Sequence, residues 1–221
     1  MTETAPQNQI FGSAQAAALY SAAAKGDLER ARQLIKQGAN PNLTNARQQN
    51  LLDVAMLKGD RKAFDNLLDL GADPALLGDA RDTTVHFAAI MDDPYWLKTL
   101  LARGTSTEVP NAMGETPLFR AVNQPGNIRL LLDAGANIQA RNRQGETLMH
   151  VAAAMGANAA VVQFLELGTD PRVIDRIGVT FQPAFFMTRE SLLNAQAKDA
   201  RAKVRAWLRA HNIPVEDSGQ R

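Results

Sequence analysis

The large hydrophobic residues of this chain recur with a long period. A pair of them appears five times, at 34–35, 67–68, 100–101, 131–132 and 164–165. Each pair stands three residues before a glycine, and these glycines, at 38, 71, 104, 135 and 168, are separated by 33, 33, 31 and 33 residues. A period of about 20–50 residues is typical of proteins built from stacked structural repeats.

Small residues mark a second position in every period. Ala22, Ala55, Ala88 and Ala152 stand sixteen residues before the glycine, whereas Ala121 stands fourteen before it, so the fourth unit has lost two residues between its helices. Small side chains let helices approach closely, and a glycine after a helix can take the left-handed conformation that closes it. Each unit is therefore predicted to be two short antiparallel helices, and the fold to be all-α.

The repeats begin with a shared sequence motif. It reads "TTVHFAA" at 83–89, "TPLFRAV" at 116–122 and "TLMHVAA" at 147–153. The threonine can cap the first helix, and Pro117 suits a first helical position because no N–H is needed there. Together with a period near 33, this motif resembles that of the ankyrin-repeat family, over about residues 17–182. The resemblance implies an all-α solenoid of about five helix-turn-helix units, a degenerate sixth unit and a C-terminal capping helix.

The repeat decays toward the C-terminus. Pro183 falls inside the expected first helix of the sixth unit, where it would remove a hydrogen bond and clash. Residues 190–213 form a helical pattern with Val204, Trp207 and Leu208 on one face and basic residues largely elsewhere, which suits a cap on the exposed end of a solenoid. We expect mobile tails at 1–12 and 214–221, repeats within 13–182 at about 17–42, 43–74, 75–107, 108–138, 139–171 and a partial 172–182, and the cap at 183–213.

Charge and composition narrow the classes of molecule that the chain is expected to bind. Lys and Arg number 24 against 23 Asp and Glu, a balance that does not favour binding to a nucleic-acid backbone. There is no cysteine and no apolar stretch of membrane-spanning length, and "MTETAPQNQI" at the start lacks the pattern of a secretory signal. We expect no membrane insertion, and leave open whether the chain works in the bacterial cytoplasm or the periplasm.

No residue pattern indicates catalysis or a metal. His86 and His150 occupy the same slot of their units, and the family resemblance implies that this histidine bonds within the turn network. His211 stands alone, and Asp92 with Asp93 before Pro94 suits a helix N-terminus better than a pair of catalytic carboxylates. We therefore expect no enzyme activity, no metal and no cofactor.

One aromatic cluster is a candidate contact. Trp96 and Leu97 fall where Ala63 and Phe64 stand in the preceding unit, so we expect them to pack between units. For Tyr95, packing on the helix surface and contact with a partner remain equal alternatives. The basic C-terminal helix, with Lys198, Arg201, Lys203, Arg205 and Arg209, is interpreted as a solvated face.

The resemblance also implies where a partner would bind. In similar proteins the turn tips and the exposed side of the first helix hold the partner. The matching positions here are Arg47, Gln49, Leu57, Asp79, Asp82, Ile90, Met91, Met113, Glu115, Asn123, Arg143, Gln144, Glu146, Met155, Arg176 and Ile177. Apolar residues at sites expected to face solvent, namely Ile90, Met91, Met113, Met155 and Ile177, indicate a protein interface; the alternative is that Ile90 and Met91 turn inward.

We therefore expect a non-catalytic protein-binding module. Its arrangement also resembles stand-alone bacterial ankyrin proteins in "IFGSAQAAALYSAAAKGDLERARQLIKQGANPN" (10–42), "DDPYWLKTLLARG" (92–104) and "VRAWLRAHNIP" (204–214). Some similar proteins are immunity proteins for secreted antibacterial toxins, including type VI lipase effectors, and that resemblance implies a cognate toxin as partner. The alternative is a host-directed effector or scaffold that uses the same surface on a eukaryotic or other bacterial partner.

Overall fold

The chain folds into successive pairs of short helices. The computed structural model describes residues 10–216 and divides them into two units, unit 1 up to Ala112 and unit 2 from Met113. Over these residues the secondary structure is helical, without strands, so the all-α prediction is confirmed. No helix within 10–216 is both long and apolar enough to cross a membrane.

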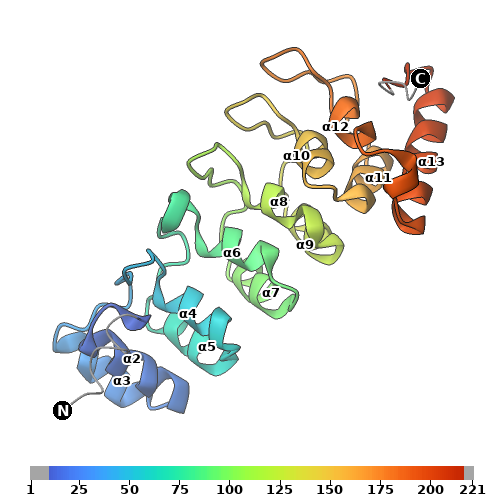
Figure 1. Ribbon diagram of the computed structural model, residues 1–221. Coiled ribbons are helices and arrows are strands. Elements are labelled where there is room, and N and C mark those ends of the chain that lie inside the picture. The colour runs from blue at the N-terminus through green and yellow to red at the C-terminus, as the bar shows by residue number, and fades with distance from the viewer. Residues whose placement is uncertain (1–9, 217–221) are drawn as a thin grey trace. The chain divides into compact units, whose positions relative to one another are not determined.

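Unit 1 contains three helix pairs. In each pair the first, inner helix is followed by an outer helix that runs back beside it, and the segments between pairs project to one side (Figure 1). The pairs are α2 (Ala14–Lys25) with α3 (Leu28–Lys36), α4 (Leu51–Lys58) with α5 (Arg61–Asp69), and α6 (Thr84–Ile90) with α7 (Tyr95–Ala102), and the short turn η1 (Asp79–Arg81) precedes α6.

Unit 2 repeats the arrangement with modified ends. Its elements are α8 (Pro117–Arg120) and η2 (Ala121–Asn123) with α9 (Pro125–Asp133), α10 (Leu148–Ala154) with α11 (Asn158–Glu166), and α12 (Gln182–Phe186) with η3 (Glu190–Leu192) and α13 (Ala195–Ala210). The two residues missing from the fourth repeat shorten the turn between its helices, because Gln124 both ends η2 and precedes α9.

The glycines that set the period close the outer helices, as predicted. Gly38, Gly71, Gly104, Gly135 and Gly168 all have positive φ, between 75° and 100°. In the first repeat the N–H of the next residue, Ala39, donates to the carbonyl of Leu34 at 2.9 Å, and the same bond recurs in the other four repeats. This bond satisfies a carbonyl that the helix end would leave unpaired.

Aromatic packing fills unit 1 between its second and third pairs. Phe64 and Trp96 are fully buried and meet edge to face, with ring centroids 5.2 Å apart. Leu97 is also buried, which confirms the expectation that this position packs between neighbouring repeats. Tyr95 is half-buried and packs on the helix surface, where its hydroxyl donates to Asp65 and the Arg61 guanidinium lies 4.4 Å from its ring centroid; contact with a partner stays a prediction.

Pro183 does not break the sixth inner helix, contrary to the sequence prediction. Helix α12 begins one position later than its counterpart in the preceding repeat, so Pro183 falls in its first turn, where its missing N–H and fixed φ are tolerated. Phe181, Phe185 and Phe186 are buried around this helix. The inner helix of the sixth pair is therefore a short version of the repeat's first helix.

The long terminal helix α13 covers α11, and one of its arginines is not solvated. Val204 and Leu208 are buried on the covered side, as the pattern predicted. Arg201, however, is buried, since its guanidinium donates to the carbonyls of Phe185 (2.9 Å) and Thr188 (2.7 Å) at the end of α12. The expected basic face is therefore wrong at this position: Arg201 caps the preceding helix.

Parts of the expected tails are held in place. The N-terminal one packs through Phe11, whose ring lies 4.9 Å from that of Tyr20, and Asn45 donates to the carbonyl of Ile10 at 2.8 Å. At the other end the N–H of Glu216 donates to the side chain of Gln182 at 2.9 Å. Residues within 10–12 and 214–216, where we expected mobile tails, thus make these contacts, and the rest of both tails lies outside the described residues.

Candidate protein-binding surface

Five-residue hairpin turns connect one helix pair to the next. In the turn 45–49, the N–H of Asn45 donates to the carbonyl of Gln49 (2.9 Å) and the N–H of Gln48 donates to the carbonyl of Asn45 (2.9 Å). The same two backbone bonds close the turns at 78–82, 142–146 and 175–179. Each turn therefore has one backbone plan, independent of its side chains.

A side chain at the first turn position normally reinforces this plan. The Asn45 Oδ1 atom accepts from the N–H groups of Arg47 (2.8 Å) and Gln49 (3.1 Å). Asn142 and Asp175 accept the equivalent pair of N–H groups in their turns. Gly78 takes this position in the second repeat and offers no acceptor, and there both Ala80 and Arg81 have positive φ.

The fourth turn position is left-handed throughout. Its φ is 58° at Gln48, 60° at Arg81, 78° at Gly114, 78° at Gly145 and 81° at Gly178. Glycine adopts this conformation freely, whereas other residues are strained in it. The left-handed position is therefore filled by glycine in unit 2 and by strained residues in unit 1.

From the hairpin 78–82 onward, each hairpin is tied to the next by a backbone bond. In unit 2 the N–H of Arg143 donates to the carbonyl of Met113 (2.8 Å), and the N–H of Arg176 donates to the carbonyl of Gln144 (2.9 Å). In unit 1 the N–H of Ala112 donates to the carbonyl of Ala80 (2.8 Å). The ties fix the spacing between hairpins before any partner binds.

Two arginines of unit 2 lie across the glycines of the preceding hairpins. A Cβ placed on Gly114 would come within 2.9 Å of Arg143 Cγ, and one on Gly145 within 3.4 Å of Arg176 Cγ. The stems are therefore packed against the backbone while both residues remain exposed. We call Arg143 and Arg176 the arginine ladder; among the described residues neither guanidinium forms an ion pair.

Most of the predicted contact residues lie on the surface. The exposed ones are Arg47, Leu57, Asp79, Ile90, Met113, Asn123, Arg143, Gln144, Met155, Arg176 and Ile177. Ile177, at a hairpin tip, is 83% exposed and Met155 is 57% exposed. Gln49, Asp82, Met91 and Glu146 are half-buried. Within unit 2 the backbone ties bring the hairpin members of this set together.

Glu115 departs from the prediction. It is only 6% exposed, so it does not present a carboxylate to a partner. Its counterparts explain why: Gln49 and Glu146 accept hydrogen bonds from the first residue of their own turns, Asn45 (3.1 Å) and Asn142 (2.6 Å). The slot serves the turn rather than the surface.

The ends of the inner helices carry methionines. Met91, Met155 and Met187 are the residues that end α6, α10 and α12. Met155 and Met187 are exposed, while Met91 is half-buried. Met187 stands 32 residues after Met155, close to one repeat period. Sequence reasoning missed it because Pro183 predicts that the repeat ends before this position. Methionine side chains adapt easily to a binding partner.

The histidine slot is structural, as the resemblance implied. The Nδ1 atom of His150 accepts from the N–H of Thr147 (3.2 Å) and pairs with its hydroxyl (2.8 Å), and Nε2 lies 3.0 Å from the carbonyl of Val179. His86 makes the same contacts with Thr83. Phe119 fills the slot in the fourth repeat, so the buried Thr116 hydroxyl, which was expected to cap α8, has no hydrogen-bond partner among the described residues.

Asp53 occupies the histidine slot of the second repeat. It is buried, and its Oδ2 atom accepts from the N–H of Asn50 at 3.1 Å. Its Oδ1 atom has no hydrogen-bond partner in the described part of the chain. Burial raises the pKa of Asp53 to about 6, and the charge of Asp82 adds to the shift.

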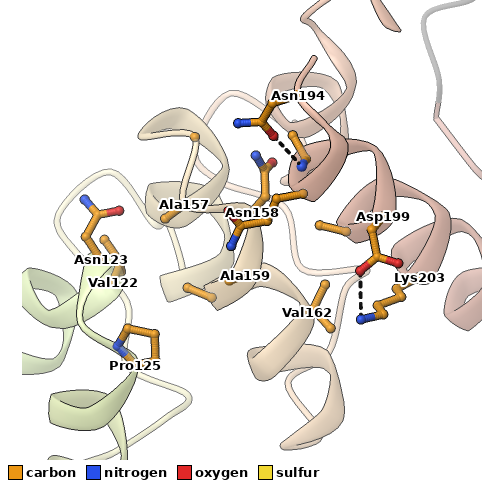
Figure 2. A pocket seen from close by; sticks show the side chains of 15 residues that line it. Val122, Asn123, Pro125, Ala157, Asn158, Ala159, Val162, Asn194, Asp199 and Lys203 are labelled. Carbon is orange, nitrogen blue, oxygen red and sulfur yellow. Dashed lines mark hydrogen bonds and ion pairs between the residues drawn. The ribbon is translucent and has the colours of Figure 1, made fainter.

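The turn that lost two residues borders a cleft of about 410 Å³ in unit 2. Figure 2 shows Val122, Asn123 and Pro125 on one side and the start of α13 on the other. Its charged groups are already paired, since Asp199 binds Lys203 at 2.8 Å, and Asn194 accepts the N–H of Ala197 at 2.8 Å. No nucleophile beside a base lines this cleft, which therefore offers no catalytic arrangement.

The remaining ionisable candidates have structural partners. Asp93 binds Arg61 (2.7 Å), which lowers the pKa of Asp93, and it accepts the N–H of Tyr95 (3.1 Å), the first residue of α7, so it serves the helix N-terminus as predicted. His211 stacks on Trp207 with ring centroids 3.7 Å apart. Within residues 10–216 no group of His, Cys, Asp and Glu could hold a metal ion.

Comparison with known families matches this geometry. The family described as "Ankyrin repeats (3 copies)" matches residues 85–175, and the family "Ankyrin repeat" matches residues 16–46, so together they cover more than half of the chain. The chain belongs to the ankyrin-repeat family. Ankyrin repeats are protein-binding modules and are typically non-catalytic, which agrees with the surface described above.

Known proteins resemble parts of the chain. Protein PhlB of Serratia liquefaciens is 39% identical over 141 residues, which are 62% of this chain and 61% of that protein. The putative ankyrin repeat protein FPV222 of Fowlpox virus is 29% identical over 128 residues, 55% of this chain and 17% of that protein. The chain therefore spans less than two thirds of either relative.

A solved structure confirms the fold. The crystal structure of an ankyrin repeat domain from Acinetobacter baumannii AYE superimposes with a TM-score of 0.67 at 22% sequence identity. The superposition covers 89% of this chain and 98% of that domain. It supports the ankyrin-repeat solenoid predicted from the sequence.

Proposed function

We propose that this ankyrin-repeat chain holds a partner protein on its hairpin tips and inner-helix ends. The observation that carries the proposal is the exposure in unit 2 of Met113 and Ile177 beside exposed hairpin arginines, and of Met155 at the end of α10. Exposed apolar residues rimmed by charge are typical of protein interfaces. Hairpins already tied to one another lose little conformational freedom on binding, so affinity can be high.

The most specific role that we propose is that of a bacterial immunity protein, which neutralises a cognate secreted toxin such as a type VI lipase effector. It is supported by the resemblance to stand-alone bacterial ankyrin proteins and by the similarity to a Serratia liquefaciens protein. Such a protein would bind one toxin tightly and block its active site or lid. The experiment is co-expression with the product of the neighbouring gene. A complex on gel filtration together with rescue from toxicity is expected, and the absence of both would end the immunity role.

The interface itself is tested by substitution. Met113→Glu and Met155→Glu each place a charge where we expect an apolar contact, and each should weaken the complex by about tenfold or more, since burying an unpaired charge is costly. Leu167→Glu is the matched control, because Leu167 is similarly exposed but ends the outer helix α11. Helicity should not change in any variant. Equal affinities for all three variants and the wild type would place the interface elsewhere.

A host-directed effector or scaffold is the second candidate. It would use the same surface on a eukaryotic or other bacterial partner. Secretion of the protein into host cells, followed by recovery of a host protein that Met155→Glu no longer binds, would favour this role over immunity.

A further inference from the structure

We infer that the arginine ladder of unit 2, Arg143 and Arg176, recognises an acidic segment of the partner protein, with apolar side chains of that segment beside it on Met113 and Ile177. The inference rests on the proposed function and adds the chemistry of the partner. It is carried by the packing of the two arginines and by the charge of the hairpins around them.

The packing of the ladder anchors the side-chain stems of both arginines. Each arginine is fixed twice, by the backbone bond that its N–H donates to the preceding hairpin and by its stem on the glycine of that hairpin. The two residues occupy the same turn position in consecutive repeats, so their side chains follow one another at the spacing of the repeat. An arginine fixed in this way loses less rotamer freedom when it binds.

The charge around the ladder is positive where a partner would meet it. Segments 138–147 and 171–180 contain four arginines, all exposed, and two carboxylates, both half-buried. The carboxylates serve the turns, since Asp175 accepts the N–H groups of Ile177 (2.9 Å) and Val179 (3.0 Å) and Glu146 accepts from Asn142 (2.6 Å). Arg172 is paired with Asp170, just before its segment, at 3.1 Å. The exposed charge of these hairpins that is unpaired among the described residues is thus carried by Arg141, Arg143 and Arg176 and is cationic.

The chemistry favours carboxylates on a protein over other anions. All the cations of the two segments are arginines and none is lysine. The planar guanidinium fork matches a carboxylate in two parallel hydrogen bonds, which a lysine cannot make. Exposed Met113 and Ile177 beside the ladder require apolar groups next to the acidic ones, and a peptide segment supplies both.

Unit 1 lacks this arrangement and gives the contrast. In its hairpins Ala112 stands at the ladder position and Arg81 stands where unit 2 has glycine. Its exposed charges are mixed, with Arg47 and Arg81 against Asp79. Acidic recognition is therefore assigned to unit 2 alone.

The test is selection of peptides from a random phage-displayed library of 16-residue peptides on the purified full chain. Recovered peptides should combine Asp or Glu with large apolar residues, and a synthetic representative, measured by fluorescence polarisation, should bind less tightly as salt rises. Arg143→Gln and Arg176→Gln should each raise Kd about tenfold, because each removes hydrogen bonds to a charged group. Arg143→Lys should recover only part of the loss.

The matched control is Arg129→Gln on the outer helix α9, which makes the same chemical change at an exposed arginine on another face. It should leave Kd unchanged. Peptides without acidic residues, or an equal loss in Arg129→Gln, would overturn the inference. So would heparin or phosphatidylserine vesicles that bind as tightly as the peptide through both arginines, since the ladder would then be a general polyanion site.

The outcome separates this inference from the proposed function. Peptides whose binding is weakened by Met155→Glu, but not by Arg143→Gln or Arg176→Gln, would overturn the inference and leave protein binding in place. An empty selection would also overturn it, and an additional failure of the neighbouring gene's product to bind would remove the immunity role as well.

Discussion

The hairpins of unit 1 and unit 2 share one backbone plan and differ in how well their side chains fit it. Unit 2 places Gly114, Gly145 and Gly178 at the left-handed position, whereas unit 1 places Gln48 and Arg81 there. The backbone bonds of the turns are the same in both units. The stacking of repeats therefore imposes the conformation even on residues that disfavour it, and the misfit is stored as strain.

The largest expected effect breaks a well-fitted turn. Gly114→Ala forces a strained φ and also brings a Cβ within 3.0 Å of the Arg143 backbone N, so we expect a loss of about 3 kcal/mol in the free energy of unfolding. Gly178→Ala shares the φ but has nothing within 4 Å of the new Cβ, and should lose only about 1 kcal/mol. Urea unfolding followed by circular dichroism measures both, and equal losses would show that the clash is relieved at no cost.

A change that restores the common turn residue should also destabilise the protein. Asparagine is usual at the first turn position, yet a Cβ on Gly78 would lie 2.6 Å from the carbonyl oxygen of Gln48. Gly78→Asn should therefore cost about 2 kcal/mol, because a backbone clash forces the chain to shift. The same unfolding measurement checks it; a stabilised variant would show that the missing Asn acceptor outweighs the close approach.

The histidine slot offers a pH-dependent comparison. Folding raises the pKa of Asp53 to about 6, so the folded state holds a proton that the unfolded chain releases at a lower pH. Stability should thus fall as pH rises from about 4 to about 6 and stay reduced above that range. Asp53→Asn removes the buried charge and should gain about 2 kcal/mol at pH 8 by this linkage, and nothing at pH 4. A gain independent of pH would mean that the charge is not the cause.

The smallest expected effect repairs the strain of unit 1. Gln48→Gly should raise the free energy of unfolding by about 1 kcal/mol, because glycine accepts the φ of 58° without strain. Ala46→Gly is the control two residues earlier, where φ is not positive, and should instead lower stability by about 0.5 kcal/mol through the entropy of the unfolded chain. If both substitutions stabilise, flexibility rather than backbone strain is the explanation.

Much of this architecture was predictable because the repeat period carries it. The spacing of Gly38, Gly71, Gly104, Gly135 and Gly168 predicted the helix pairs, and the shared Thr and His positions predicted the caps at Thr83 and Thr147. Periodicity failed where a single residue decides the outcome. Pro183 was misjudged because a one-residue shift of the helix start moves proline from a forbidden to a tolerated position.

The surface was less predictable than the fold. Register placed Arg143 and Arg176 at exposed turn positions, but the packing of their stems on Gly114 and Gly145 depends on contacts between repeats. Glu115 was misplaced because the same register position serves hydrogen bonds within the turn. Arg201 looked like part of a solvated basic face, and only the end of α12 reveals why it is buried.

The backbone ties between hairpins make the array open to lengthening. The turn 142–146 donates its Arg143 N–H to the carbonyl of Met113 in the preceding hairpin, and its Gln144 carbonyl accepts the N–H of Arg176 from the next hairpin. A duplicate of residues 139–171 inserted after 171 would find the same donor and acceptor at both junctions. Duplication of this gene segment could thus add another hairpin with an exposed arginine and lengthen the binding surface, because the contacts at the new junctions already exist in the chain.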